Sequence, residues 1–277
     1  MMNKKLLVAI LVLIFIVAIV VFLLQREASP PPVASSTPDA EIVLPATPGL
    51  PTNPSENILI NYDFYSVSYD EAHEQPDWVM YKLVGDSLDN PKFKRRDNFR
   101  ADKNVATGSA TPSDYKKSGY DRGHLAPAAD MSWSKEALSE TFYMTNMSPQ
   151  KPGFNRGIWK ELEEQVRDWA MESDELYVVT GPVLKGKMDF IGKNEVAVPK
   201  LYYKIILDYK GPDFKAVAFV MSNEKHDDPL QNFVVSIDSV ESLTGLNFFG
   251  DLPDSFEESL ENVVTISNWF PSPEQRN

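Results

Sequence analysis

The chain has 277 residues, 43% of them hydrophobic and 11% aromatic, which suffices for one large globular domain or two small ones. Its net charge of −13 taken alone argues against a nucleic-acid partner, but an enzyme needs only a local cationic groove. The absence of cysteine excludes disulfides, thiol nucleophiles and cysteine-based zinc sites, and leaves the compartment open.

An uninterrupted apolar run of 19 residues, Leu6–Leu24, follows Lys4 and Lys5. As a helix it would span about 28 Å, the thickness of a bilayer core, so residues 1–24 are predicted to be an N-terminal transmembrane anchor. The preceding lysines place the N-terminus in the cytoplasm and the rest of the chain outside, in the periplasm or at the cell surface. A cleaved signal peptide and a secreted protein form the alternative, although such apolar regions usually have about 7–15 residues.

Residues 25–57 contain eight of the 21 prolines and many serine, threonine and alanine residues. Such a composition cannot form a core and predicts a semi-extended tether. We therefore expect the folded domain to occupy residues 58–277.

Four segments within this domain are rich in β-branched and aromatic residues and predict strands. They are Trp78–Leu83, Tyr177–Thr180, Tyr202–Leu207 and Ala216–Met221. A turn at Gly211–Asp213 would join the last two as an antiparallel hairpin. Helices are predicted over Ile158–Met171 and Asp238–Thr244, the latter ending at Gly245. Strands mixed with irregularly placed helices are typical of the α+β class.

A cationic run precedes the strongest motif of the chain. Residues 92–103 hold six cationic side chains against two acidic ones, a local net charge of +4. A solvated loop would explain the run, but its position just upstream of the motif favours contact with phosphate.

That motif is Tyr120–Ala128, in which Asp121-Arg122-Gly123-His124 sets a cation and an imidazole close together. A cation can hold a phosphate while a neutral imidazole takes a proton from water. Alone, Arg-Gly-His is more simply explained as a turn with an incidental histidine. The segment Thr145–Gln150 follows, and then Asn155.

The predicted helix Ile158–Met171 can be tested by counting. At 100° per residue its buried stripe comprises Ile158, Leu162, Val166 and Trp169. Glu163 and Arg167 lie at the margin of that stripe, four and eight residues after Trp159. On spacing alone they form an exposed pair contributing ~0.2–0.5 kcal/mol, and Asn155 is a helix cap.

Together with Arg95–Phe99, Thr180–Pro182 and Thr244–Leu246, these motifs resemble the DNA/RNA non-specific endonuclease family of ββα-metal, or His-Me finger, nucleases. The likeness extends from about Tyr62 to about Leu252. It implies a ββα-metal nuclease fold of the α+β class, with a central antiparallel sheet flanked by helices.

The resemblance also implies roles. Asn155 would be the only direct protein ligand of Mg²⁺, with Mn²⁺ as a substitute, and Glu163 would hold metal-bound water. His124, whose unperturbed pKa near 6.5 leaves it mostly neutral, would be the general base. Arg95 would stabilise charge on the phosphate, with Arg96 as the second candidate.

The remaining candidates have supporting roles. Arg122 and Arg167 would bind flanking phosphates or brace Glu163, Asn146 would orient the histidine or the metal loop, and Asp121 would support the loop. The expected activity is hydrolysis of phosphodiester bonds in DNA and RNA without sequence specificity, because phosphates carry no base information. A membrane-tethered protein that binds nucleic acid without cutting it is the alternative. The sequence allows a homodimer but leaves the oligomeric state open.

Overall fold

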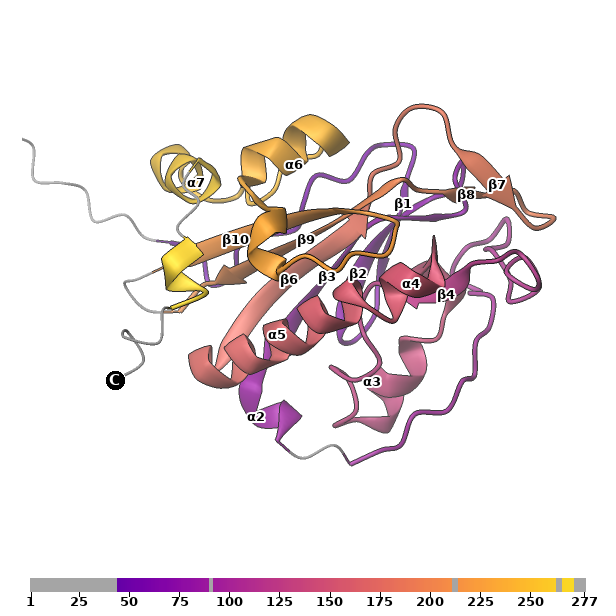
Figure 1. The fold of residues 1–277 in the computed structure, drawn as a ribbon, viewed down its shortest axis with the longest axis horizontal. Helices are drawn as coiled ribbons and strands as arrows, with labels where there is room; N and C mark the ends of the chain where they lie inside the picture. The colour runs from indigo at the N-terminus through magenta and orange to yellow at the C-terminus, as the bar shows by residue number, and fades with distance from the viewer. Residues whose placement is uncertain (1–43, 90–91, 211–213, 263–265, 272–277) are drawn as a thin grey trace, which may run out of the picture. The chain divides into compact units, whose positions relative to one another are not determined.

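The computed structural model describes residues 44–89, 92–210, 214–262 and 266–271, and its centre is a seven-stranded sheet (Figure 1). The strands, in their spatial order, are Ile58–Asn61 (β1), Tyr65–Asp70 (β2), Gln75–Val84 (β3), Glu175–Pro182 (β6), Leu201–Asp208 (β9), Lys215–Ser222 (β10) and Val234–Val235 (β11). Every neighbouring pair is antiparallel. The expected central antiparallel sheet is therefore confirmed.

Helices and two small hairpins surround this sheet. The helices are Gly85–Leu88 (α2), Lys135–Glu140 (α3), Pro152–Asn155 (α4), Ile158–Ser173 (α5), Ile237–Thr244 (α6) and Asp254–Glu261 (α7), with short 3₁₀ turns at Met144–Asn146, Leu230–Phe233 and Ile266–Asn268. One hairpin pairs Asp121–His124 (β4) with Met147–Gln150 (β5), and the other pairs Asp189–Ile191 (β7) with Val196–Val198 (β8).

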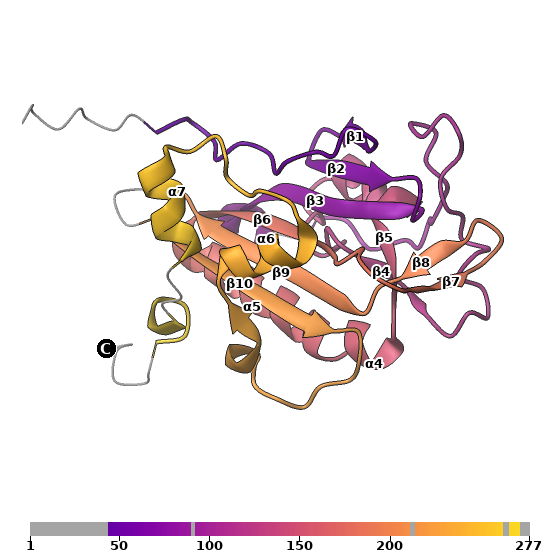
Figure 2. The same ribbon diagram turned by 90° about the horizontal axis from the view of Figure 1, so that it is seen from above.

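The sheet separates two hydrophobic cores. Helix α5 lies against one face of the sheet, while α6 and α7 lie against the other (Figures 1 and 2). The α5 core includes Leu162, Val166 and Trp169 packed with residues of β2, β3 and β6, and the opposite core includes Trp78 and Phe248. Both sheet faces are thus buried, which explains the nearly continuous apolar strands.

The predicted elements agree with the structure. Each of the four predicted strands lies inside β3, β6, β9 or β10, and the last two pair antiparallel. All four residues of the predicted buried stripe of α5 are buried, and Trp159 and Ala170 are buried as well. Helix α6 ends at Gly245 with a left-handed φ of 73°. Glycine adopts this conformation without a steric penalty and so ends the helix. The predicted turn at Gly211–Asp213 lies outside the described residues.

The chain makes one long excursion between two adjacent strands. Strands β3 and β6 pair from Val79 with Thr180 to Val84 with Glu175. The segment that connects them, residues 85–174, contains the β4–β5 hairpin, α3, α4 and α5. Described residues of this segment, from Val105 to Ala170, pack in the core on the α5 face of the sheet.

The folded part begins before Ile58, contrary to the predicted end of the tether. Trp78 Nε1 donates to the carbonyl of Thr52 at 3.0 Å, and Tyr209 Oη donates to the carbonyl of Pro45 at 2.8 Å. These hydrogen bonds attach residues 45–57 to the folded domain. A proline-rich segment cannot form a core of its own, but it can pack against an existing one. The predicted anchor, residues 1–24, and the first part of the tether fall outside the described residues. Among the helices that are described, none has the length and apolar character needed to cross a bilayer.

Candidate active site

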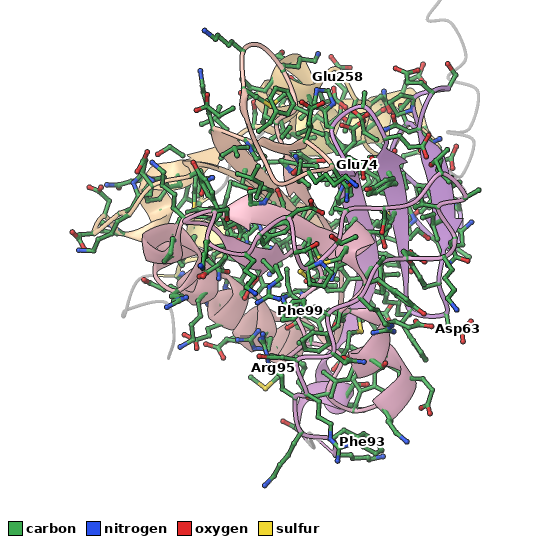
Figure 3. The ribbon with its side chains drawn as sticks, turned by 90° about the vertical axis from the view of Figure 1, so that its right-hand side faces the viewer. Asp63, Glu74, Phe93, Arg95, Phe99 and Glu258 are labelled. Atoms are coloured by element: carbon green, nitrogen blue, oxygen red, sulfur yellow. The ribbon has the colours of Figure 1, made fainter. Side chains whose placement is uncertain are left out.

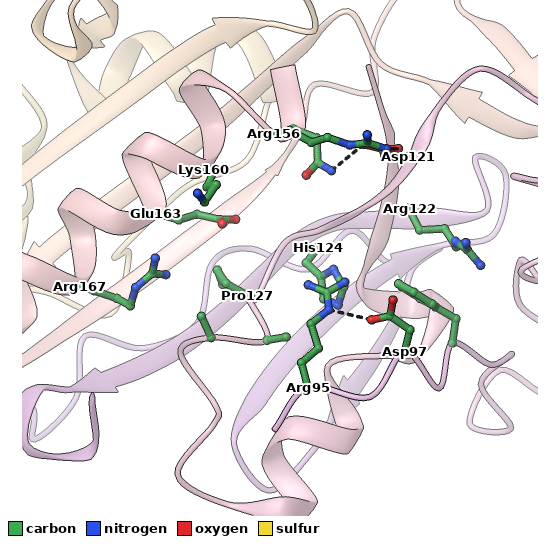
Figure 4. Close-up of a pocket in the computed structure, with 14 residues that line it drawn as sticks. Arg95, Asp97, Asp121, Arg122, His124, Pro127, Arg156, Lys160, Glu163 and Arg167 are labelled. Atoms are coloured by element: carbon green, nitrogen blue, oxygen red, sulfur yellow. Dashed lines mark hydrogen bonds and ion pairs between the residues drawn. The ribbon is translucent and has the colours of Figure 1, made fainter. Parts of the chain in front are cut away.

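A pocket of about 460 Å³ lies between the β4–β5 hairpin, the beginning of α5 and the loop that precedes β4 (Figure 4). Seven of the nine candidate residues line it, namely Arg95, Asp121, Arg122, His124, Asn155, Glu163 and Arg167. Asn146 and Arg96 are not among its lining residues. The structure therefore brings together side chains that lie up to 72 positions apart in the sequence, which spacing alone could not establish.

His124 is the last residue of β4 and only 8% of it is exposed. Its ring packs in a cluster with two phenylalanines, with centroids 5.5 Å from Phe99 and 5.0 Å from Phe142, and these two phenylalanine centroids are themselves 5.0 Å apart. Burial, followed by the positive charge of Arg95, lowers the pKa of His124 to about 3. The imidazole is consequently neutral at physiological pH. Its Nε2 is buried and has no hydrogen-bond partner among the described residues.

The hairpin positions His124 through its glycine. Gly123 pairs with Ser148, and a Cβ on Gly123 would lie 2.2 Å from the side-chain Cδ of Gln150. The fully buried Gln150 side chain therefore occupies the space that any other residue at position 123 would need. This close approach explains why a glycine separates Arg122 from His124.

Asn155 is the last residue of α4, three positions before α5 begins. The expectation that Asn155 caps α5 is wrong, because Gly157 occupies the cap position and makes no side-chain cap bond. The Asn155 amide instead donates from Nδ2 to Asp121 Oδ2 at 3.0 Å. Asp121 also accepts two hydrogen bonds from Arg156, at 2.8 Å and 2.7 Å. Although burial alone would raise it, these bonds hold the pKa of Asp121 below its usual range.

Glu163 and Arg167 lie on α5 at the other side of the pocket, and Figure 4 shows both reaching from the helix toward the hairpin. Arg167 does not pair with Glu163. Its Nη1 donates to Asp130 Oδ1 at 2.9 Å, while Tyr81 Oη donates to Asp130 Oδ2 at 2.8 Å. Because Asp130 is only 1% exposed, the half-buried Arg167 serves as its counter-ion.

Lys204 supplies positive charge to Glu163 from beneath the helix. It lies on β9, is 1% exposed, and its Nζ has no hydrogen-bond partner among the described residues. The ammonium lies 4.7 Å from the ring centroid of Trp159. Burial raises the pKa of Glu163, and the charge of Lys204 is the largest influence opposing that rise. The Lys204 ammonium, which makes no hydrogen bond to a described residue, is thus close enough to stabilise the charged form of Glu163.

Two exposed arginines flank His124. Arg95 Nε pairs with Asp97 Oδ1 at 2.7 Å, and its guanidinium lies 5.3 Å from the centroid of Phe142. Arg122 stacks over Phe99 at 4.3 Å. The two phenylalanines that pack on the histidine therefore also support the two cations, which can bind an anion beside the imidazole.

Asn146 acts on backbone rather than on the pocket. Its amide accepts from Ala126 N and donates to Ala126 O, both at 2.9 Å, and it donates to Thr141 O at the same distance. These bonds hold the chain two residues after His124, in agreement with a positioning role. Arg96 lines a neighbouring cavity and makes no contact with the pocket.

Sequence reasoning assigned no role to five charged residues of the site: Asp97, Asp130, Arg156, Lys160 and Lys204. Lys160 lines the pocket one turn of α5 before Glu164, with which it pairs at 3.3 Å. Its spacing was available in the sequence, since it lies one turn after Arg156. Asp130 and Lys204 carried no such signal, because their partners lie 37 and 41 positions away.

The pocket's oxygen groups fit a hard cation. Asn155 Oδ1 accepts no hydrogen bond among the described residues, and the Glu163 carboxylate makes none either. Amide and carboxylate oxygens are the donors that Mg²⁺ prefers, usually few in number and supplemented by water. The described part of the chain contains one cluster of three acidic groups close enough to hold an ion, Asp238, Glu241 and Glu261, and it does not line this pocket.

Comparisons with known proteins agree with this geometry. The model of the DNA/RNA non-specific endonuclease family matches residues 46–255. A nuclease of Nostoc sp. is 37% identical over 221 residues, covering 76% of this chain and 79% of the relative. Human mitochondrial endonuclease G is 37% identical over 204 residues, covering 69% of each chain.

A solved structure has the same fold. The chain superimposes on one in the crystal structure of the EndoG/EndoGI complex with a TM-score of 0.68 and 33% sequence identity. The match covers 75% of this chain and 89% of the other. It extends the likeness from sequence motifs to the arrangement of the sheet and its helices.

Proposed function

This chain belongs to the DNA/RNA non-specific endonuclease family, and from that premise we propose that it is a Mg²⁺-dependent endonuclease that hydrolyses both DNA and RNA. The observation that carries the proposal is the buried, unpartnered Nε2 of His124 in a pocket shared with Asn155 and Glu163. A buried nitrogen without a partner has a cost in free energy unless function supplies the partner.

His124 is proposed as the general base. Its low pKa keeps the imidazole neutral, so one of the two ring nitrogens keeps a lone pair that can accept a proton from the attacking water. The phosphodiester anion would offset the charges of Arg95 and Arg122, which contribute to the low pKa. Substrate binding would thus strengthen the base at the moment when it is needed.

Asn155 is proposed as the direct ligand of the metal ion, and Glu163 as the group that accepts hydrogen bonds from water around it. When bound, the ion would neutralise charge on the phosphate and on the leaving oxygen. Asp121 holds the Asn155 amide by its nitrogen, so the oxygen is the end left for a cation. Mn²⁺ offers the same preference for oxygen ligands.

Arg95 is proposed to stabilise the charge that develops on the phosphate, and Arg122 to bind a flanking phosphate. Both are exposed and adjoin His124 through Phe142 and Phe99. Contacts that reach only phosphates do not distinguish sequences or sugars, which supports action on both DNA and RNA. Arg167 is assigned to Asp130 instead of to substrate.

A plasmid-nicking assay tests the proposal against a protein that only binds nucleic acid. The unit formed by residues 44–277 should cut plasmid DNA and an RNA transcript with Mg²⁺, and should stop in excess EDTA. Cutting that continues in EDTA would eliminate the metal assignment. Binding without any cutting, in Mg²⁺ or Mn²⁺, would establish the non-catalytic alternative.

Location outside the cytoplasm remains part of the proposal. The apolar run Leu6–Leu24 after two lysines supports a single-pass anchor with the nuclease domain in the periplasm or at the surface. Protease added to intact cells or spheroplasts should remove the domain and leave the anchor in membranes. A mature N-terminus mapped near Ser29 would instead establish a cleaved signal peptide.

A further inference from the structure

A second cavity lies next to the catalytic pocket, between the loop that begins at Lys92 and helix α3. Its volume is about 700 Å³, within the usual range for small-ligand sites. It is lined by Lys92, Phe93, Lys94, Arg96, Asn98, Lys135, Leu138 and Ser139. Four of these eight residues are cationic and none is acidic, although the chain as a whole carries a net charge of −13.

The four cations have no acidic partners. Nine ion pairs occur among the described residues, and Lys92, Lys94, Arg96 and Lys135 take part in none of them. All four side chains belong to exposed residues, so their charges face solvent around a single hollow. Uncompensated charge of one sign around a cavity attracts a ligand of the opposite sign.

An aromatic ring stands among these charges. Phe93 is 40% exposed, one of the few large apolar side chains of the described residues that face solvent to this extent. The backbone fixes its position, because Lys92 N and Phe93 N both donate to the carbonyl of Ser132, at 3.1 Å and 3.0 Å. The ring is therefore an exposed apolar surface on an anchored loop, with cations on either side in the sequence.

One chain segment contributes residues to both the cavity and the catalytic pocket. Arg95 lines the pocket, while Lys94 and Arg96, its two neighbours in sequence, line the cavity. Figure 3 shows Phe99, Arg95 and Phe93 following one another along the same side of the molecule. A polyanion bound at Arg95 would thus meet the cavity as its next contact.

We propose that this cavity is an accessory subsite for single-stranded nucleic acid, in which an unpaired base stacks on Phe93 while the four cations bind the phosphates beside it. Every base has a face that can stack on an aromatic ring, so such a subsite accepts any sequence. A duplex keeps its bases inside and could offer only phosphates. The identity of the physiological ligand rests on the proposed nuclease function. The binding itself can be measured whether or not the protein is a nuclease.

Binding can be measured without cleavage, in EDTA, by fluorescence anisotropy of a labelled oligonucleotide as a single strand and as the corresponding duplex. Phe93→Ala should weaken single-strand binding about 5- to 100-fold, as is typical for loss of one stacking contact, and should change duplex binding less than twofold. Phe93→Trp should restore the single-strand affinity. Lys135→Gln should weaken both forms and reduce the dependence on salt.

Two matched variants control for surface changes in general. Phe190 on β7 is 54% exposed and lines neither cavity, so Phe190→Ala should leave both affinities unchanged. Lys193 is exposed, lies outside both cavities and forms no ion pair with a described residue, so Lys193→Gln is the control for Lys135→Gln.

The outcomes separate the subsite from the nuclease proposal. Phe93→Ala with wild-type single-strand affinity, or with an equal loss for the duplex, overturns base stacking even if the protein cuts plasmid normally. Competition by polyglutamate as strong as that of the oligonucleotide, unaffected by Phe93→Ala, would also overturn it and indicate an acidic protein partner. Loss of single-strand binding in Phe93→Ala supports the subsite even if the wild type cuts nothing.

Discussion

Asn155 Nδ2 donates a hydrogen bond of 3.0 Å to Asp121 Oδ2, and this bond determines which end of the amide is left for the pocket. Asp121 is itself held by both Nε and Nη2 of Arg156. A fork of two parallel bonds fixes a carboxylate in direction as well as in place. Asp121 therefore orients the proposed metal ligand, a more specific role than general support of its loop.

Asp121→Ala should let the amide rotate and expose its nitrogen to the ion. Loss of a residue that hydrogen-bonds to a metal ligand typically reduces metal affinity or activity about 10- to 100-fold. The Mg²⁺ concentration for half-maximal cleavage should therefore rise by about that factor. A Mg²⁺ titration of plasmid nicking measures it. Arg156→Gln, which leaves the Asp121–Asn155 bond in place, should have the smaller effect; equal titration curves for wild type and Asp121→Ala would remove this role.

His124→Ala should lower kcat by about 10²- to 10⁴-fold, the usual range for a lost general base, while nucleic-acid binding in EDTA persists. Single-turnover cleavage and anisotropy measure the two effects separately. Turnover close to that of the wild type would take the role of base away from His124.

Acid should destabilise the fold through His124. In the unfolded chain its pKa is near 6.5, whereas in the folded protein burial lowers it to about 3. Its contribution to stability is fully present above pH 6.5 and is lost as the pH falls toward 3, because the unfolded chain then binds the extra proton. Melting temperatures measured from about pH 7 to pH 5 should therefore fall less in His124→Gln than in the wild type.

His73 provides a control of opposite sign for the same measurement. A hydrogen bond from His73 to Asp70 raises the pKa of the imidazole. Its contribution is present below the unfolded value of about 6.5 and is lost as the pH rises through the folded value. Acidification should consequently lower the melting temperature of His73→Gln more than that of the wild type. Parallel curves for both variants would contradict these assignments.

Lys204→Met should weaken both the fold and the metal response. Without the ammonium, only Arg167 opposes the negative charge of Glu163 and Asp130, so the pKa of Glu163 should rise further and an uncompensated carboxylate would remain at the base of the pocket. Lys204→Arg, which keeps the charge, should retain more of the Mg²⁺ affinity than Lys204→Met.

The control for Lys204→Met is Lys82→Met on β3, where a partly exposed pair with Glu175 at 2.7 Å contributes only ~0–1 kcal/mol. Adding Glu163→Gln to Lys204→Met should cost less than the sum of the two single changes, since the uncompensated carboxylate is then gone. Denaturant unfolding and the Mg²⁺ titration are the measurements. Strict additivity would show that the two groups do not interact.

Features that depend on the local pattern of apolar and polar residues could be predicted from the sequence. Periodicity predicted the buried face of α5, and β-branched runs predicted strands β3, β6, β9 and β10. The ordered motifs predicted that His124, Asn155 and Glu163 would meet, and the structure places all three at one pocket. Their chemical roles remain predictions.

The charges beneath the pocket could not be predicted in this way. Lys204 lies within Tyr202–Leu207, where alternate residues face opposite sides of a sheet that is buried on both. A strand that is buried on both faces shows no alternation of polar and apolar residues, so the sequence does not indicate which face Lys204 points to or that it is buried. Only the tertiary packing of α5 on β9 shows that it lies beneath Glu163.

The register of β9 therefore has a consequence beyond stability. Lys204 is opposite Thr180 on β6 and Phe219 on β10, and these pairings direct its side chain to the face covered by α5. A slip of one residue would turn Lys204 to the face of α6 and α7, since successive side chains in a strand alternate. A mutation that changes no pocket residue, such as a single-residue deletion near the start of β9, could thus abolish the charge balance at Glu163 while leaving every proposed ligand in the sequence. The charge balance at the proposed site therefore depends on the register of β9 as well as on the identity of the pocket residues.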